Sequence, residues 1–536
     1  MSRRVSVLLR AALTLLAGCV WLTGPGCDEG ACDTGGGAHE PARPSVDDMR
    51  SPSRFAALIE TIEAERAALG GPGAAVAVVE EGRVTFSRGF GSKRPDGGDP
   101  VLDTTLFRVG SVTKMLTTAG LLQQAAQGKV DLAQPLSTYV PDFKLSRDPT
   151  WAPSIAVRHL LTHSAGLSDF LQIDWPQRDD SALSDFLTGS TFADRVYLMA
   201  PAGRMWNYSN PNFMLAGLLL ERVGGMPYRT YLRDRLLAPL GMARTMFLPA
   251  EVIADGDFAV GRSAGMAVPP DAYDNPWARP AGYAFSSVID LARFAQLLIA
   301  GAAVLPDAAR QAMVDPQINT ALNLDLLAYG YALFVTEGVT MRGRFYRERV
   351  VYHGGDIPGF AADLYIVSRT GFAIVVLAGA DGAHFQRSIA QALQQFAGLP
   401  AASSPPDGSF HAGDYDRYVG EYLDPFNIGP LQVAKSGDQL TVTMPLLDRA
   451  KIPYEPVLVP GVRHNFVLKV QGAALALTFV LDGDGHAEYA RTRVAVARRG
   501  GAPVGAVARG MKLDRAALLQ ALHSPLAPAA SAAVLP

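Results

Sequence analysis

A serine and a lysine three positions apart form a residue pair suited to nucleophilic chemistry. Ser111 and Lys114 lie in the run 107–114, and apolar residues at helical spacing follow as far as Gly128. In the first turn of a helix, this spacing places the lysine amine on the same face as the serine hydroxyl. A desolvated lysine can accept the hydroxyl proton and thereby activate the serine. The alternative is a capping serine beside a solvated lysine, but this is the only S-x-x-K pattern in the chain.

Two further short motifs carry polar groups next to expected elements. Tyr208-Ser209-Asn210 precedes an apolar helical run from Phe213 to Glu221, so a turn there would present Tyr208 and Asn210 to a cleft. His353-Gly354-Gly355-Asp356 ends a strand-like run, where glycines let a substrate backbone lie along the strand edge. A packed tyrosine, a turn asparagine and a strand-end histidine are the alternatives. A second Tyr-x-Asn, at 273–275, lies in a loop with no helix after it, so we favour Tyr208.

In this order the motifs resemble those of the serine β-lactamase and D,D-peptidase superfamily, which are S-x-x-K, Y-x-N and K-T-G or H-x-G. The tyrosine of the second motif makes the chain most similar to class C β-lactamases, exocellular D,D-carboxypeptidases, D-aminopeptidases and family VIII esterases. The strings at 106–108 and 158–167 resemble the same group. The resemblance spans about residues 54–397 and implies an α+β fold, in which an antiparallel sheet is flanked by helices and joined by a helical subdomain.

The resemblance also implies roles for residues. Ser111 would form a covalent ester, with Lys114 and Tyr208 sharing the work of the base and Tyr208 passing the proton to the leaving group. Asn210 would hold a substrate amide or carbonyl. The backbone N–H groups of Ser111 and Asp356, beside Gly355, would form the oxyanion hole. The expected function is a serine hydrolase acting on esters or amides.

A catalytically silent protein that binds or senses cell-wall fragments is the alternative function. Such proteins usually lose a catalytic side chain, whereas Ser111, Lys114 and Tyr208 are all present. The enzyme is therefore the favoured interpretation.

His353 stands where many relatives of this group carry lysine. A neutral imidazole lacks the fixed positive charge that faces a substrate carboxylate, unless a nearby arginine supplies it. The candidates for that arginine are Arg342, Arg344, Arg347 and Arg349. We therefore expect substrates such as neutral esters, amides or D-amino-acid peptides in preference to β-lactams, and the sequence leaves the choice among them open.

Other motifs in the chain do not meet the requirements of their chemistry. His159 and His163 have the spacing of a helical zinc site, but Leu160 stands where a zincin needs glutamate. The run 482–486 resembles the start of a calcium loop but lacks its later glycine and glutamate, so we predict a hairpin turn. Ser164 lacks the first glycine of a G-x-S-x-G elbow. We expect neither a metal nor a cofactor.

The elements that must position these residues follow from hydrophobic periodicity. Residues 54–69 have helical spacing, two β-rich runs at 73–79 and 83–90 predict a hairpin, and residues 111–300 are mostly helical. Strand-like runs return at 331–336, 349–353, 361–367 and 371–377, before a last helix at 385–396. The sheet is thus expected to draw strands from both ends of a 54–397 domain, around an inserted helical block.

A second, smaller domain is expected after a Pro/Ser/Gly-rich linker at 398–413. Short alternating segments within 414–500 predict an antiparallel sheet or small barrel. This β domain would restrict access to the cleft or bind a partner. The tail at 501–536 is predicted to be flexible, apart from a short helix near 513–522.

The N-terminus has the pattern of an export signal. Residues 1–26 combine early arginines with an apolar stretch too short to span a bilayer, and residues 27–53 form a tether. The string Leu-Ala-Gly-Cys ending at Cys19 resembles a lipobox, with cleavage before the cysteine and its lipidation. The alternative is an ordinary signal peptide. Both kinds of signal predict an extracytoplasmic protein, periplasmic or secreted. The lipobox additionally predicts membrane attachment through the lipid.

Composition narrows the classes of partner. The 536 residues are 49% hydrophobic, carry a net charge of −3 and contain no polybasic run, which excludes a nucleic-acid-binding surface of the usual kind. All three cysteines precede residue 33, so the domains rely on packing without disulfides. The expected partner is a small-molecule or peptide substrate, and protein partners stay open.

Overall fold

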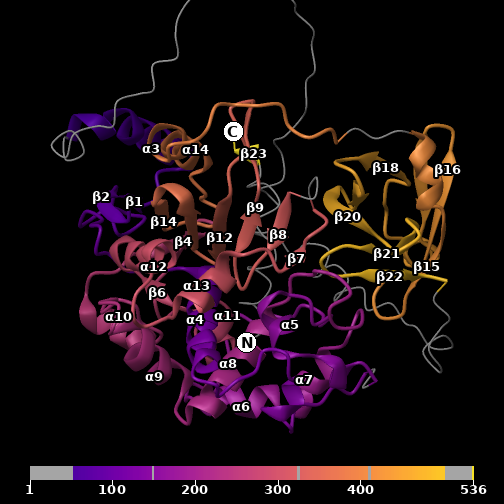
Figure 1. The fold of residues 1–536 in the computed structure, drawn as a ribbon, viewed down its shortest axis with the longest axis horizontal. Coiled ribbons are helices and arrows are strands. Elements are labelled where there is room, and N and C mark those ends of the chain that lie inside the picture. The colour runs from indigo at the N-terminus through magenta and orange to yellow at the C-terminus, as the bar shows by residue number, and fades with distance from the viewer. Residues whose placement is uncertain (1–51, 148–149, 323–325, 409–411, 501–533, 536) are drawn as a thin grey trace, which may run out of the picture.

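The computed structural model describes residues 52–147, 150–322, 326–408, 412–500 and 534–535 (Figure 1). The predicted signal, Cys19, most of the tether and the helix near 513–522 lie outside these ranges. Within the described ranges, no helix combines the length and the apolar character needed to cross a membrane.

The centre of the larger domain is an eight-stranded antiparallel sheet. Its spatial order is β2 (Arg83–Phe90), β1 (Ala74–Glu80), β14 (Phe372–Ala378), β13 (Phe360–Val367), β12 (Val350–Ile357), β9 (Phe334–Thr336), β8 (Leu327–Tyr329) and β7 (Ile318–Asn319). Strands from both ends of the domain therefore lie side by side, as the sequence predicted.

Both faces of this sheet are covered by helices. Alternate residues of β1 point to opposite faces, so Val76 packs with α3 (Ala56–Ala68) and α14 (Gln386–Phe396), whereas Ala77 packs with α12 (Val288–Ala300). A strand covered on both faces must be apolar throughout, and every residue of β1 is buried.

The helical block lies between the two halves of the sheet in the sequence. Besides α12, it comprises α4 (Thr113–Ala126), α5 (Val157–Leu161), α6 (Ala182–Leu187), α7 (Ser190–Arg195), α8 (Asn210–Gly224), α9 (Tyr228–Leu232), α10 (Pro249–Asp255), α11 (Arg279–Gly282) and α13 (Asp307–Val314). Helices α4 and α8 pack together at its centre, where both are buried nearly all round.

Short strands complete the larger domain. They are β3 (Phe107–Arg108) paired with β6 (Phe285–Ser286), β4 (Gly261–Ser263) paired with β5 (Met266–Val268), and β10 (Val339–Met341) paired with β11 (Arg344–Tyr346). Pairing of β3 with β6 fixes the chain immediately before Ser111.

The smaller domain is a closed antiparallel barrel with an aromatic core. Its strands are β15 (Gly420–Asp424), β16 (Gly429–Ser436), β17 (Gln439–Thr443), β18 (Val457–Pro460), β19 (Asn465–Val470), β20 (Ala473–Leu481), β21 (Ala487–Arg491) and β22 (Val496–Arg499), with α15 (Pro445–Arg449) after β17. Pairing of β15 with β22 closes it, and Tyr418 stacks on Phe479 in the interior at 4.8 Å. Turn 482–486 joins β20 to β21, as predicted.

The barrel docks directly on the larger domain. Tyr197 stacks on Phe426 with ring centroids 4.1 Å apart, inside a cluster shared by both domains. Arg491 of β21 is buried and donates hydrogen bonds to the carbonyl of Thr320 and to Asn207. In Figure 1 the barrel lies beside β7 and β8, in agreement with these contacts.

The end of the tail differs from the prediction of a flexible segment. β23 (Val534–Leu535) pairs in parallel with β10, and Leu535 is buried against the larger domain. The Ala/Pro-rich composition of the tail gave no indication of these two apolar residues, which complete an edge next to β10.

Candidate active site

Ser111 lies in a tight turn between a strand and a buried helix. The 3-10 turn η2 (Gly110–Val112) follows β3 and leads into α4, so Ser111 lies two residues before the α-helix begins instead of inside it. Thr113 fastens the turn by donating to the carbonyl of Gly110 at 2.7 Å and accepting from the amide of Ala284 at 3.1 Å. Ser111 is partly exposed while its neighbours in the turn are buried.

Lys114 is fully buried and has three polar neighbours. Its Nζ lies 2.9 Å from Ser111 Oγ, 2.9 Å from Asn210 Oδ1 and 2.6 Å from the carbonyl oxygen of Ala281. Burial lowers the pKa of Lys114 well below its usual value of 10.5. The amide and carbonyl oxygens only accept hydrogen bonds, so a neutral amine directs its two N–H groups to them and its lone pair to the serine.

Tyr208 completes the contacts to the nucleophile. Its hydroxyl donates to Ser111 Oγ at 2.8 Å, and its ring packs on His163 with centroids 4.1 Å apart. Burial raises the pKa of Tyr208 further above its usual value of 10. The phenol is therefore protonated at neutral pH and acts as a hydrogen-bond donor.

Glycines bring strand β12 against the serine turn. A Cβ atom on Gly355 would overlap the carbonyl oxygen of Val109 and lie 3.0 Å from the amide nitrogen of Ser111. A Cβ atom on Gly110 would lie 2.8 Å from the amide nitrogen of Asp356. The backbone amides of Ser111 and Asp356 are thus close together, which is the arrangement an oxyanion hole requires.

His353 lies beneath the site and does not face a cleft. It is 2% exposed, its Nε2 lies 3.1 Å from the Tyr329 hydroxyl, and its Nδ1 lies 2.6 Å from the carbonyl oxygen of Gly354. Burial lowers the pKa of His353 to about 3, so its ring is neutral. The expected role in substrate binding does not fit this burial, and the imidazole instead supports the aromatic side chains around Tyr208.

The arginine at the site is not one of the four that the sequence suggested. Arg342 hydrogen-bonds Gln391 and Arg349 pairs with Glu337, both away from Ser111. The other two candidates, Arg344 and Arg347, are exposed. The reason is the topology of the fold. The four arginines lie in or next to the β10–β11 hairpin, and this hairpin pairs with the tail strand β23 in a sheet separate from the one that contains β12.

Arg493 of the barrel reaches the site from the turn between β21 and β22. Its guanidinium lies 4.9 Å from the centre of the Tyr208 ring and 2.6 Å from the carboxylate of Asp169. Asp169 in turn accepts from the backbone and side-chain nitrogens of Asn210 at 2.8 and 3.1 Å. A polar chain therefore runs from the barrel to Lys114.

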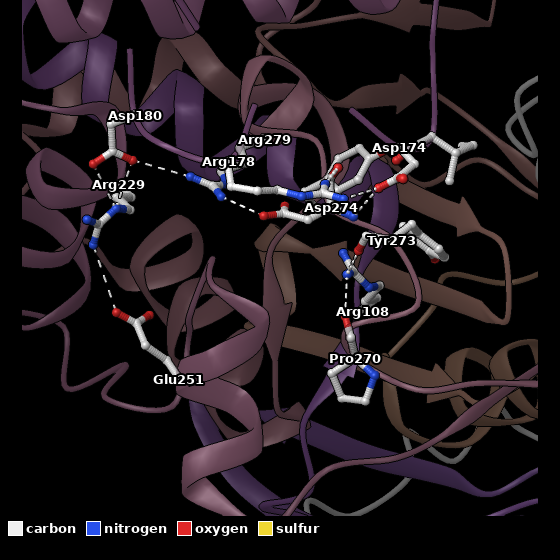
Figure 2. A network of polar contacts seen from close by, with 12 residues as sticks. Arg108, Asp174, Arg178, Asp180, Arg229, Glu251, Pro270, Tyr273, Asp274 and Arg279 are labelled. Carbon is white, nitrogen blue, oxygen red and sulfur yellow. Dashed lines mark hydrogen bonds and ion pairs between the residues drawn. The ribbon is translucent and has the colours of Figure 1, made fainter. Parts of the chain in front are cut away.

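The second Tyr-x-Asn segment has a structural role (Figure 2). Arg108 donates to the carbonyls of Pro270 and Tyr273, both at 2.7 Å, and Asp274 pairs with Arg279 at 2.7 Å. This network fixes the segment that presents the Ala281 carbonyl to Lys114. Figure 2 shows it continuing through ion pairs of Arg279 with Asp180, of Asp180 with Arg229, and of Arg229 with Glu251.

The two histidines with the spacing of a helical zinc site each make a structural contact of their own. His159 accepts a hydrogen bond from the amide of Ala156 at 3.1 Å, at the start of α5. His163 accepts from the amide of Ser209 at 3.2 Å and packs on Tyr208. Both are therefore explained by local structure.

Sequence reasoning missed three groups at the site. Asp169 lies two residues after the string at 158–167, so its position near the motif was a usable signal. The Ala281 carbonyl and Arg493 carry no local signal, because a backbone oxygen has no sequence signature and Arg493 lies 324 positions from Asp169.

Together, the fold and the serine, lysine and tyrosine cluster define a class, the serine hydrolase superfamily that includes β-lactamases and penicillin-binding proteins. The chain belongs to the beta-lactamase family, whose model matches residues 58–398.

Similar proteins agree with this assignment. Protein flp of Staphylococcus aureus (strain MW2) is 25% identical over 313 residues, which are 57% of this chain and 59% of flp. The chain thus matches less than two thirds of the length of such curated relatives.

Solved structures share the fold. SurE with D-Leu aligns with a TM-score of 0.62 and 22% identity over 84% of this chain and 100% of SurE. The octameric penicillin-binding protein homologue from Pyrococcus abyssi aligns with a TM-score of 0.53 and 21% identity over 82% of this chain and 99% of that protein. At these identities the likeness is one of fold alone.

Proposed function

We propose that this protein is a serine hydrolase that forms an acyl-enzyme on Ser111 and cleaves ester or amide bonds. The observation that carries the proposal is the double contact of Ser111 Oγ, with Lys114 Nζ at 2.9 Å and the Tyr208 hydroxyl at 2.8 Å. A buried amine and a protonated phenol on one serine provide a base and an acid for the same oxygen.

The proposed reaction assigns one step to each group. Ser111 Oγ attacks the substrate carbonyl carbon while its proton passes to Lys114, and the amides of Ser111 and Asp356 stabilise the negative oxygen. The intermediate then collapses, and the leaving group takes the Tyr208 proton, which Lys114 replaces. Water then attacks the carbonyl carbon of the ester, its proton passes to Tyr208, and the proton of Tyr208 passes to Lys114. Lys114 finally returns a proton to Ser111 Oγ as the ester bond breaks. The raised pKa of Tyr208 favours this donor role over a role as the primary base.

D-amino-acid peptides and carboxylic esters are the proposed substrates, ahead of β-lactams. His353 is neutral, and the charge of Arg493 is offset by Asp169, so neither side chain offers an unbalanced positive charge to a substrate carboxylate. A protein of the same fold, SurE, has been solved with D-Leu.

An extracytoplasmic location, with lipid attachment at Cys19, is also proposed. Its support is the arginine-led apolar stretch and the lipobox-like string at the N-terminus. Membrane fractionation of the native protein and of Cys19→Ala tests it, and equal release of both into the soluble fraction contradicts lipidation.

Hydrolysis of a substrate panel tests the function. Short-chain p-nitrophenyl esters, D-alanyl peptides and nitrocefin are given to the wild type, Ser111→Ala and Lys114→Met. We expect turnover of an ester or a D-peptide by the wild type, and loss of about 10³-fold or more in both variants. Equal turnover by Ser111→Ala would contradict the proposal, and fast turnover of nitrocefin alone would contradict the substrate class.

A further inference from the structure

Asp169 bridges the catalytic segment and the barrel through its two carboxylate oxygens. Oδ1 accepts from the backbone N and the side-chain Nδ2 of Asn210, at 2.8 and 3.1 Å. Oδ2 accepts from Nε and Nη2 of Arg493, at 3.0 and 2.6 Å. The side chains of Asp169 and Arg493 are only 11% and 15% exposed, so water screens this pair weakly.

The first role of Asp169 is to hold the start of helix α8. Ser209, at the capping position, donates its hydroxyl to the carbonyl of Ser168 and does not cap the helix with its side chain. The amide of Asn210, the first residue of the helix, instead donates to the Asp169 carboxylate. A negative charge at a helix N-terminus is also favoured by the helix dipole.

The second role of Asp169 is to fix which way the Asn210 amide points. An ionised carboxylate only accepts hydrogen bonds, so the NH₂ group of Asn210 must face Asp169. Asn210 Oδ1 is then turned toward Lys114 Nζ, at 2.9 Å. In the opposite orientation two donors would face each other, and Lys114 would lose one of the acceptors that direct its lone pair to Ser111.

Arg493 brings the barrel into this arrangement. Its backbone carbonyl accepts from Asn207 Nδ2 at 3.0 Å, so the turn between β21 and β22 is fastened next to Tyr208 at two points. The guanidinium then holds Asp169 with two charge-assisted hydrogen bonds that converge on Oδ2.

We propose that Asp169 and Arg493 are positioning residues, through which the barrel completes the active site by orienting Asn210 toward Lys114. This inference rests on the proposed function of Ser111 and Lys114, and it gives the barrel a part in the chemistry. Neither side chain is assigned a contact with the reacting atoms.

The rate at which a fluorophosphonate acylates Ser111 tests the inference in the full-length protein. Asp169→Asn is expected to slow acylation by about 10- to 100-fold, because small misplacements of catalytic groups cost rates of this order. Arg493→Gln is expected to slow it by about 10-fold, and Arg493→Lys, which keeps the charge but not the paired N–H donors, to recover only part of that loss.

Arg204→Gln is the matched control. Arg204 also pairs across the two domains, with Glu488 at 2.7 Å, but it does not contact Asp169. Its loss weakens docking of the barrel without disturbing Asn210, so the acylation rate is expected to stay at the wild-type value.

The pH dependence of acylation separates positioning from a general loosening of the structure. Burial has the largest effect on the pKa of Lys114 and lowers it, the charge of Asp169 raises this pKa, and the charge of Arg493 lowers it further. The acylation rate rises with pH as Lys114 loses its proton, and this rise is the acid limb of the pH–rate profile. Asp169→Asn is therefore expected to move the acid limb to lower pH, and Arg493→Gln to move it to higher pH. Loosening alone would not move the limb in opposite directions.

The outcomes of this experiment are distinct. A wild type that is not labelled at Ser111 contradicts both proposals. A labelled wild type, with unchanged rates and limbs in Asp169→Asn and Arg493→Gln, contradicts the positioning role alone, as does an equal loss in Arg204→Gln. If Asp169→Asn does not fold, the comparison of Arg493→Gln with Arg493→Lys decides.

Discussion

At the scale of single residues, the site depends on how burial sets two protonation states. Lys114 loses its proton easily because it is buried, and Tyr208 keeps its proton for the same reason. Opposite effects on an amine and a phenol follow from one cause, since burial disfavours whichever form is charged. Ser111 thus faces a base and a donor without any buried net charge on either.

The activity should therefore rise with pH as Lys114 loses its proton, which gives the pH–rate profile a limb set by the pKa of Lys114. The amine is inactive below its pKa, where it is protonated, and active above it. Because burial lowers this pKa well below 10.5, the limb in kcat/KM is expected far to the acid side of that value. A limb near 10.5 would show that Lys114 is solvated in the free enzyme.

Removal of the Tyr208 hydroxyl should reduce catalysis without loss of the fold. Tyr208→Phe keeps the ring that packs on His163 but loses the donor to Ser111. We expect kcat to fall by about 10²- to 10⁴-fold, the range typical of a general acid, while the melting temperature changes little. Tyr329→Phe removes a buried hydroxyl that contacts His353 and not Ser111, so a comparable loss there would argue against a specific role for Tyr208.

At the scale of elements, the close approach of β12 to the serine turn is the feature that positions the oxyanion hole. Gly355→Ala places a methyl group against the Val109 carbonyl and near the Ser111 amide, so the strand must move away. Acylation of Ser111 is expected to fall steeply, together with the melting temperature.

Gly483→Ala serves as the control for that substitution, because a Cβ atom there meets open space in the β20–β21 turn. It should leave both measurements unchanged. Wild-type acylation in Gly355→Ala would show that the two amides do not need this spacing.

A histidine joins two adjacent strands of the same sheet and should make stability depend on pH. His384 lies 3.0 Å from Asp356 of β12 and 2.8 Å from Asp363 of β13. Burial alone would lower its pKa, but the two carboxylates raise it well above its usual 6.5. The contribution of His384 to stability is then complete below about pH 6.5, which is its pKa in the unfolded chain. It is lost as pH rises through its pKa in the folded protein.

Thermal unfolding of the wild type and His384→Gln from pH 6 to pH 10 measures this contribution. The difference in melting temperature should be largest at pH 6 and should shrink toward pH 10. A difference that grows with pH would contradict the assigned direction of the pKa.

At the scale of the whole molecule, sequence reasoning succeeded where the signal was local. The hairpin at 73–90, the turn at 482–486 and the three motifs around Ser111, Tyr208 and Gly355 are each contained in a few consecutive residues, and the fold places the motifs together. It failed where the fold joins distant segments. The pairing of Arg493 with Asp169 and of β23 with β10 depends on docking that no local pattern encodes.

The central claim is that Ser111 is the nucleophile, and the direct measurement is the position of a covalent adduct. Purified protein is incubated with a fluorophosphonate and, in parallel, with a labelled penicillin, and the modified peptide is identified by mass spectrometry. We predict a fluorophosphonate adduct on Ser111 that is absent from Ser111→Ala. An adduct on any other residue, or labelling that persists in Ser111→Ala, would contradict the account.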